Sequence, residues 1–449
     1  MIYTDDFEKY SKSTYTGYDI QNQFNDADVN LYEGTKGQEI VYLSRNDWQG
    51  TYPSAVKLTC TSAKMIEDMQ YGHDPVENEE DEMPLYNTIG SYGQLTLAMM
   101  INLEYDDPMW EELLNQLTWE ETNILCSYGA NAVAGAESVA APGAKVKDGP
   151  CGIGIANTNL DSLMAIPSAT LMAATWNEEL IEKMGNAFGM EILHVGYTGI
   201  YGVGANMHRS AYGGRSWEYF SEDGFLTGKM FAAESRGLIN RGVMMFTKHF
   251  ALNDQEWNRY GGTVWANEQS IREIYLKGFE IGVVEGNCNG MMSSFNRIGC
   301  TWAGSHRGLL TEVLRNEWNF LGIVETDAGV GTHMTVKEAM AEGIVAGNDL
   351  WMTGGNASAW DYYKDNATVC QALRESAHRI LYTQLHSSAM NGISSTSYIL
   401  VLTPWWEYAL MILTEWLGIF TGTCAVFAVI SFIKHGVASK KKKSKAKRR

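Results

Sequence analysis

The sequence predicts an α/β protein whose main part is a closed (β/α)8 barrel of the TIM type over residues 107–392. Short apolar runs alternate with helical stretches throughout this range, which is the pattern of repeated βα units. The range also has the length that one such barrel needs, about 250 residues or more. An open, doubly wound sheet is the alternative. A third observation, a charge-free apolar run at residues 416–433, predicts one membrane-spanning helix after the barrel.

The composition suits a folded chain of several domains. The chain has 449 residues, 45% of them hydrophobic, and a formal net charge of −19. Eight of the last ten residues are Lys or Arg, so the rest of the chain is more acidic still. An acidic body argues against nucleic acid as a partner.

The first region, residues 1–106, is acidic and irregular, with one strand-like run at residues 39–43. A single strand and a few helices make a poor independent core, so we expect the chain to begin inside a domain. The first residues have neither a basic nor an apolar region, so we expect no signal peptide.

Within residues 107–392, six apolar runs are strand candidates, each followed by a helix. After Asn267, apolar residues that include Ile271, Ile274 and Phe279 recur at helical spacing, so one face of that helix is expected to pack against the sheet. The candidates are Thr170–Trp176, Ile200–Asn206, Val243–Lys248, Gly290–Phe295, Gly322–Thr326 and Asp349–Met352.

The C-terminal region is predicted to be a linker at residues 393–407, a transmembrane helix at 408–433 and a basic tail at 434–449. Three tryptophans near the start of the helix suit a membrane interface, and the basic tail favours the cytoplasmic side. The barrel would then be extracellular. The alternatives are a buried core helix, and a barrel on the cytoplasmic face because no signal peptide is expected.

The seven cysteines are scattered and show no Cys-x-x-Cys spacing, so neither a disulfide framework nor a zinc site is indicated. A disulfide or two outside the cell stays open. We expect no metal and no organic cofactor. The oligomeric state is not indicated by the sequence.

Five segments, in chain order, resemble the catalytic barrel of glycoside hydrolase family 3, the family of β-glucosidases and their relatives. Their order and spacing over nearly 200 residues make coincidence improbable. They are Lys147-Asp148-Gly149-Pro150, Gly204 to Arg209, Gly213 to Asp223, Lys248-His249-Phe250 with Asn253, Gln255, Glu256 and Arg259, and Thr326-Asp327.

Asp327 suits the role of nucleophile. A retaining glycosidase needs one carboxylate to attack the anomeric carbon and a second group to protonate the leaving oxygen. Asp327 follows the apolar strand at residues 322–324, at the end where barrel enzymes keep their catalytic groups. The alternative is a helix-capping aspartate before Gly329.

A glucose ring needs charged or forked partners to hold its hydroxyls in one pose. The resemblance implies that Asp148 holds the distal hydroxyls and that Arg215, Lys248 and His249 contact the others. It also implies a substrate-binding role for Met292 and Phe295.

Three positions depart from the family. Phe295 stands where a tyrosine hydroxyl usually supports the nucleophile. Ala328 replaces an aromatic platform for the sugar, which predicts a more open site. Glu325 lies two residues before Asp327 and would point to the same side, where a second carboxylate could raise the pKa of Asp327.

In full-length relatives the acid/base glutamate comes from an α/β-sandwich domain, in a segment reading roughly Ser-Arg-x-Ser-Gly-Glu-Gly. The segment Ser44-Arg45-Asn46-Asp47-Trp48-Gln49-Gly50 resembles it, so residues 1–106 are interpreted as a partial sandwich before the barrel, as in circularly permuted members. Gln49 then takes the position of the acid/base.

The resulting prediction is a membrane-anchored retaining β-glucosidase that acts on cello-oligosaccharides or plant β-glucosides. The alternative is a catalytically impaired sugar-binding protein that keeps Asp148, Arg215, Lys248 and His249 but lacks a proton donor. An N-acetylhexosaminidase is disfavoured, because residues 250–254 replace the Pro-Gly-His-Gly type of loop in that branch.

Overall fold

The computed structural model describes residues 11–37, 39–41, 61–69, 75, 77–88, 93–154, 163–209, 213–328, 337–398 and 404–446. The chain divides into two compact units, residues 1–398 and residues 399–449. The boundaries predicted at residues 106 and 392 stay predictions.

The first unit is built around a six-stranded sheet with the order β1-β2-β3-β4-β6-β9. The strands from β2 to β9 are parallel, and β1 is antiparallel to β2. This arrangement confirms the α/β fold class. The strands are β1 (Ala132–Val133), β2 (Ala144–Asp148), β3 (Gly199–Gly204), β4 (Met244–Phe250), β6 (Gly290–Ser293) and β9 (Ile323–Thr326).

Hydrogen bonding continues beyond β9. Leu350 forms an isolated parallel β-bridge with Glu325, and Met352 forms an antiparallel one with Tyr128. The Trp351 amide donates to the Cys126 carbonyl at 2.9 Å. These bridges extend the sheet toward the segment before β1, but within the described residues this sheet has six strands rather than eight. The closed (β/α)8 barrel therefore stays a prediction.

Four of the six predicted strands coincide with β3, β4, β6 and β9, and the candidate at 349–352 forms only the bridges above. The strand predicted at Thr170–Trp176 is wrong, because Ala169–Ala173 is the helix α5. Ser168 caps that helix by accepting a hydrogen bond from the Leu171 amide. A short apolar run does not distinguish a strand from a buried helix, and here the Ser168 cap favours the helix.

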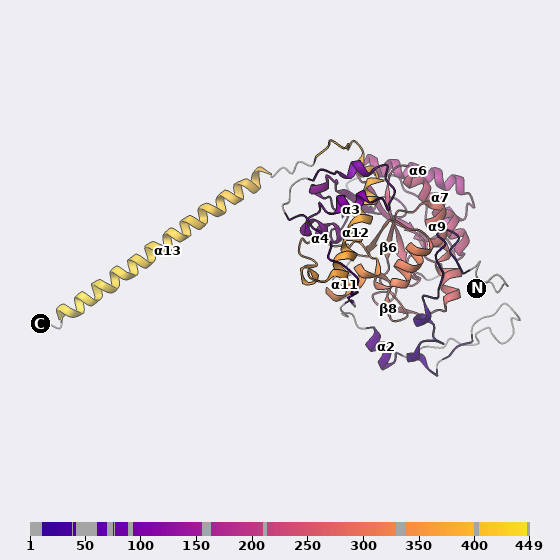
Figure 1. Cartoon of the computed structure of the whole chain (residues 1–449), viewed down its shortest axis with the longest axis horizontal. Coiled ribbons are helices and arrows are strands. Elements are labelled where there is room, and N and C mark those ends of the chain that lie inside the picture. Colours follow the sequence, from indigo (N-terminus) through magenta and orange to yellow (C-terminus); the bar gives the residue numbers. More distant parts are fainter. Residues whose placement is uncertain are drawn as a thin grey trace. The chain divides into compact units, whose positions relative to one another are not determined.

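Helices lie around the sheet, with α6, α7 and α9 on one side and α3, α4, α11 and α12 on another (Figure 1). Their inward faces form two buried apolar clusters that hold the sheet between them. The α-helices of this unit are α2 (Ala63–Asp68), α3 (Met109–Leu114), α4 (Trp119–Ser127), α5 (Ala169–Ala173), α6 (Glu178–His194), α7 (Gly224–Ile239), α8 (Glu268–Ser270), α9 (Lys277–Gly286), α11 (Lys337–Ala346) and α12 (Ala367–Leu385).

The helical segment after Asn267 was expected to bury Ile271, Ile274 and Phe279 on one face. Ile271 and Phe279 are buried, but Ile274 is 44% exposed. The reason is the π-helical stretch Ile271–Tyr275 between α8 and α9, because its wider turn rotates the residues away from the 3.6-residue period. A second π-helix covers Gly308–Glu317.

The described part of the N-terminal region packs on the same unit. The Ser13 hydroxyl donates to the Glu317 carbonyl, and the Tyr32 and Trp265 rings are 5.1 Å apart. Residues 39–41 are not in a strand, contrary to the run expected at 39–43, whose last two residues lie outside the described residues. A three-stranded sheet completes the unit, made of β5 (Thr263–Val264), β7 (Arg297–Ile298) and β8 (Thr301–Trp302).

The second unit contains one long helix, α13 (Trp405–Ala446). Its part from Trp405 to Lys440 is long and apolar enough to cross a membrane, with a mean hydropathy of 2.0 in its most apolar window. The predicted helix is therefore present. Its crossing of a membrane is taken up below as a proposal.

Candidate active site

The predicted site residues lie at the carboxyl ends of parallel strands. Asp148 is the last residue of β2, Lys248 and His249 belong to β4, and Asp327 directly follows β9. The register pairs Asp148 with Tyr201 and Gly204 with Lys248, so neighbouring strands end at the same edge. In open and closed α/β folds alike, this edge is where ligands bind.

Asp327 has two unlike carboxylate oxygens. Its Oδ1 accepts a hydrogen bond from the Ala328 amide at 2.6 Å. Its Oδ2 has no hydrogen-bond partner among the described residues. Burial raises the pKa of Asp327 to about 6, although the Ala328 amide and the charges of Arg259, Arg215 and Lys248 oppose this shift. The carboxylate is therefore fixed through one oxygen and leaves the other free to react.

His249 is a neutral imidazole, and both of its ring nitrogens have hydrogen-bond partners. Burial lowers the pKa of His249 well below its ordinary value, and the nearby Arg215 and Lys248 charges lower it further. Arg215 lies 2.8 Å from Nε2, and the Tyr219 hydroxyl lies 3.0 Å from Nδ1. Since a guanidinium can only donate, Nε2 accepts and the proton is assigned to Nδ1, which donates to Tyr219.

Two cations flank this imidazole and share one buried carboxylate. The Lys248 ammonium lies 2.8 Å from Asp148 Oδ1 and 3.6 Å from Glu218 Oε2. Glu218 also pairs with the Arg215 Nε. Burial alone would lower the pKa of Arg215, but Glu218, Tyr219 and Glu256 together outweigh it and the pKa is raised. Glu218 therefore lies between the two cations.

Met292 and Phe295 are buried to the same extent as Lys248 and His249. Met292 lies in β6 opposite Glu325 and is 3% exposed. Phe295 is 2% exposed, and its ring packs 4.6 Å from Tyr260 and 5.0 Å from the Arg259 guanidinium. Their contact with a sugar stays a prediction.

Glu325 is a buried carboxyl beside Asp327. Burial raises the pKa of Glu325 well above its ordinary value, and the Asp327 charge raises it further. Burial is also the largest cause of the raised pKa of Asp327. The effect of Glu325 on the pKa of Asp327 stays a prediction.

Gln49, the predicted acid/base position, lies outside the described residues. Four residues that the sequence reasoning left without a role do contact the site: Glu218, Tyr219, Asn206 and Arg259. Asn206 holds the His249 peptide from both sides, accepting from its amide at 2.7 Å and donating to its carbonyl at 2.9 Å. All four lie inside the segments that resemble the family, so the sequence pointed to these positions without indicating what each side chain does.

Comparison with known proteins identifies a family that this chain matches. Residues 152–384 match the family model described as the glycosyl hydrolase family 3 N-terminal domain. β-Glucosidase A of Butyrivibrio fibrisolvens is 40% identical over 218 residues, which is 48% of this chain and 25% of that protein. A β-glucosidase of Ruminococcus albus is 35% identical over 266 residues, which is 57% of this chain and 28% of that protein.

Among solved structures, a β-glucosidase from Paenibacillus barengoltzii superposes with a TM-score of 0.60 at 27% identity. The match covers 76% of this chain and 37% of that one. The chain thus spans about a quarter to a third of the length of the curated relatives named above. The family model covers β3 to β9 with Arg215, Lys248, His249 and Asp327, and it begins after β2 and Asp148.

Proposed function

Because the chain belongs to glycoside hydrolase family 3, we propose that it hydrolyses β-glucosidic bonds by a retaining mechanism with Asp327 as nucleophile. The observation that carries the proposal is the Oδ2 of Asp327, which lies at the carboxyl edge of the sheet and has no hydrogen-bond partner within the part of the chain that the structure describes. A carboxylate oxygen that no donor satisfies keeps its full nucleophilic character. The neutral Nε2 of His249, 3.5 Å away, offers it no proton.

The charged cluster supports the choice of a sugar as substrate. Arg215 and Lys248 present donors, while Asp148, whose side chain is 66% exposed, presents acceptors. A pyranose has hydroxyls that both donate and accept, so this mixture suits it better than a purely anionic ligand. We propose that Asp148 and Lys248 hold neighbouring hydroxyls and that Arg215, oriented by its hydrogen bond to His249, holds the next one.

In the first chemical step, Oδ2 attacks the anomeric carbon and the bond to the leaving oxygen breaks, giving a covalent glycosyl-enzyme. The positive charges of Arg215, Lys248 and Arg259 lie close enough to influence the Asp327 carboxylate electrostatically. They favour its ionised form before the attack. Water then hydrolyses the glycosyl-enzyme, which restores Asp327.

The substrates proposed are β-linked glucosides such as cello-oligosaccharides and plant β-glucosides. A second candidate is a sugar-binding protein with little turnover. The observation that favours it is Gln49 in the position that the resemblance gives to the acid/base, since an amide has no acidic proton.

The test is Asp327→Ala in the full chain, assayed on a nitrophenyl β-glucoside. We expect activity to fall by about a thousandfold or more, because an essential covalent group is lost. Asp365→Ala, at an exposed aspartate, is the matched control and should keep its activity. More than about a tenth of the activity in Asp327→Ala would overturn the role of nucleophile.

We further propose that α13 crosses a membrane once, with the basic tail in the cytoplasm and the catalytic part outside. The length and hydropathy of Trp405–Lys440 and the eight basic residues after Ser439 support this orientation. Protease added to intact cells should digest the catalytic part and leave an epitope at Arg449 protected. Protection of the catalytic part would instead place it on the cytoplasmic side.

A further inference from the structure

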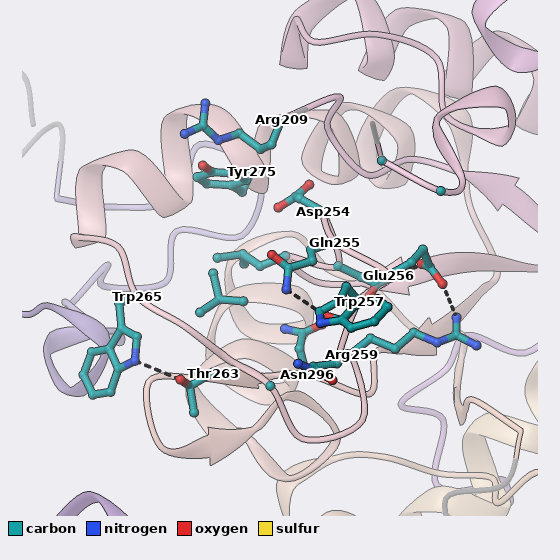
Figure 2. A pocket seen from close by; sticks show the side chains of 17 residues that line it. Arg209, Asp254, Gln255, Glu256, Trp257, Arg259, Thr263, Trp265, Tyr275 and Asn296 are labelled. Carbon is teal, nitrogen blue, oxygen red and sulfur yellow. Dashed lines mark hydrogen bonds and ion pairs between the residues drawn. The ribbon is translucent and has the colours of Figure 1, made fainter. Parts of the chain in front are cut away.

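A second cavity, of about 710 Å3, lies beside the charged cluster. Its wall comes from the segment 252–265, which follows β4, together with Arg209, Tyr275 and Asn296 (Figure 2). Asp148, Arg215, Lys248, His249 and Asp327 do not line it. This volume is in the range of small-molecule sites, and the cavity is separate from the site described above.

The cavity wall offers both hydrogen-bond donors and acceptors. Two guanidinium groups, of Arg209 and Arg259, and two carboxyl groups, of Asp254 and Glu256, line it. Arg259 and Glu256 form an ion pair of 3.0 Å. Burial raises the pKa of Asp254 to about 7, although it accepts a hydrogen bond from the Met207 amide. Such a mixture of groups suits a polar ligand whose hydroxyls both donate and accept.

Two buried amide oxygens in the wall lack donors. Asn253 and Asn296 are each 3% exposed, and the Oδ1 of each has no hydrogen-bond partner among the described residues. Their orientation is fixed by their nitrogens: Asn296 Nδ2 donates to the Ala251 carbonyl, and Asn253 Nδ2 donates to the Glu256 carboxylate. The oxygens therefore remain acceptors, and an unsatisfied buried acceptor favours a ligand that brings hydroxyl donors.

Aromatic side chains provide the apolar part of the wall. Trp257 is 80% exposed, and Trp265 and Tyr275 also line the cavity. Tyr275 lies next to Arg209 (Figure 2). Amphipathic rings that border polar groups suit a ligand with both apolar C–H faces and hydroxyls.

We propose that this cavity is a second carbohydrate site, which holds a neutral sugar unit of a β-linked glucose oligosaccharide apart from Asp327. The choice of glucose oligosaccharide rests on the proposed function, whereas the polar, hydroxyl-rich character of the ligand rests on the cavity alone. Asn253 joins the two sites, since its Nδ2 also donates to the Tyr219 hydroxyl, which bonds His249.

The test is equilibrium dialysis of labelled cellotriose against the full chain in detergent micelles, with Asp327→Ala in every protein so that no turnover occurs. Asp148→Ala is added to disable the first site. In this double variant we expect one cellotriose per chain to remain bound at millimolar concentration. Adding Trp257→Ala should weaken that binding about tenfold or more, because an aromatic anchor is lost.

Trp176→Ala is the matched control, since Trp176 is 75% exposed and lies outside the cavity. It should leave binding unchanged. Absence of cellotriose binding in the double variant, or equal binding with and without Trp257, would overturn the second site. A failure of the proposed function would give a different result. Adding Asp148→Ala to Asp327→Ala would then leave the amount of bound cellotriose unchanged, whereas adding Trp257→Ala would still weaken binding at the second site.

Discussion

The Nε2 of His249 lies 3.5 Å from the Oδ2 of Asp327, yet the two groups do not form an ion pair. Burial keeps the imidazole neutral, and Nε2 already accepts a hydrogen bond from Arg215. The one acceptor nitrogen of the neutral imidazole is thus taken, and Oδ2 of Asp327 faces a nitrogen that has no proton to donate. This arrangement leaves Asp327 as the titrating group of the pair.

We expect turnover to depend on pH through the ionisation of Asp327. The pKa of Asp327 is raised to about 6 by burial, and a nucleophilic carboxylate must be ionised. We expect kcat/KM to fall as the pH drops through about 6, with no separate limb from His249. Arg259→Gln should move the midpoint to higher pH, because it removes a charge that favours the carboxylate.

Arg307→Gln is the control for this measurement, since its side chain is 61% exposed and contacts Glu312 instead. Its pH profile should match that of the unaltered chain. An acidic limb near the ordinary aspartate value of about 4 would mean that Asp327 is solvated, contrary to the structure.

Glu218 is expected to matter as a positioning residue. It is 2% exposed and pairs with Arg215 while lying 3.6 Å from Lys248. Glu218→Gln keeps the shape but removes the charge that holds two cations. We expect KM for a nitrophenyl β-glucoside to rise about tenfold or more, with a lower melting temperature because buried cations lose their partner.

The exposed neighbour Glu222 supplies the control, and Glu222→Gln should change neither quantity. If Glu218→Gln lowered the melting temperature but left KM unaltered, Glu218 would stabilise the fold without positioning the cations for substrate.

Glu234 should make stability depend on pH. It lies in α7, is fully buried, and both of its carboxyl oxygens lack a partner among the described residues. Burial raises its pKa to about 8. The folded chain therefore binds a proton more tightly than the unfolded chain, and this contribution is full below about pH 4.5 and is lost as the pH rises toward 8.

Glu234→Gln removes that dependence, because its amide does not titrate. Between pH 4.5 and 8, the free energy of unfolding of the unaltered chain should fall more steeply with pH than that of the variant. The difference in slope should be up to about 1.4 kcal/mol per pH unit, measured by denaturation with urea. Glu80→Gln, at an exposed glutamate, should not alter the slope. Equal slopes for Glu234→Gln and the unaltered chain would mean that Glu234 is solvated or paired.

The sequence predicted that Lys248 and Asp327 lie near the carboxyl ends of apolar strands, and parallel strands bring such ends to one edge. It did not predict β2, which ends at Asp148, because two lysines interrupt the apolar residues of Ala144–Asp148. It also could not predict that Glu218 would lie buried between two cations, or that burial would raise the pKa of Glu325. Both depend on how much solvent the packed neighbours exclude, which is not a property of the local pattern.

The errors in the fold have a similar origin. The run at 170–176 is apolar enough for a strand, and only the cap by Ser168 and the packing of α5 decide otherwise. Likewise, the π-helical turn before α9 moves Ile274 to the surface, and a period of 3.6 residues does not anticipate it.

The last prediction concerns Gln49 and separates an enzyme from a binding protein. Glutamine resembles glutamate in shape but has no acidic proton, so it can orient a sugar oxygen without protonating a leaving group. A nitrophenolate leaves with little protonation, so Asp327 could still be glycosylated. Hydrolysis of the glycosyl-enzyme would be slow because no base activates water. We therefore expect a burst followed by a slow steady state on a nitrophenyl β-glucoside, and almost no turnover of cellobiose.

Gln49→Glu should raise the hydrolysis of cellobiose by roughly 10²- to 10⁴-fold, the contribution of a well-placed acid/base. Gln49→Ala is the control, because it removes the amide without adding an acid and should give no gain. An unaltered chain that cleaves cellobiose at an ordinary rate, with no gain from Gln49→Glu, would mean that another residue supplies the proton. The carboxylates at residues 77–82 would then be tested next, and the interpretation of Ser44 to Gly50 as the acid/base segment would be wrong.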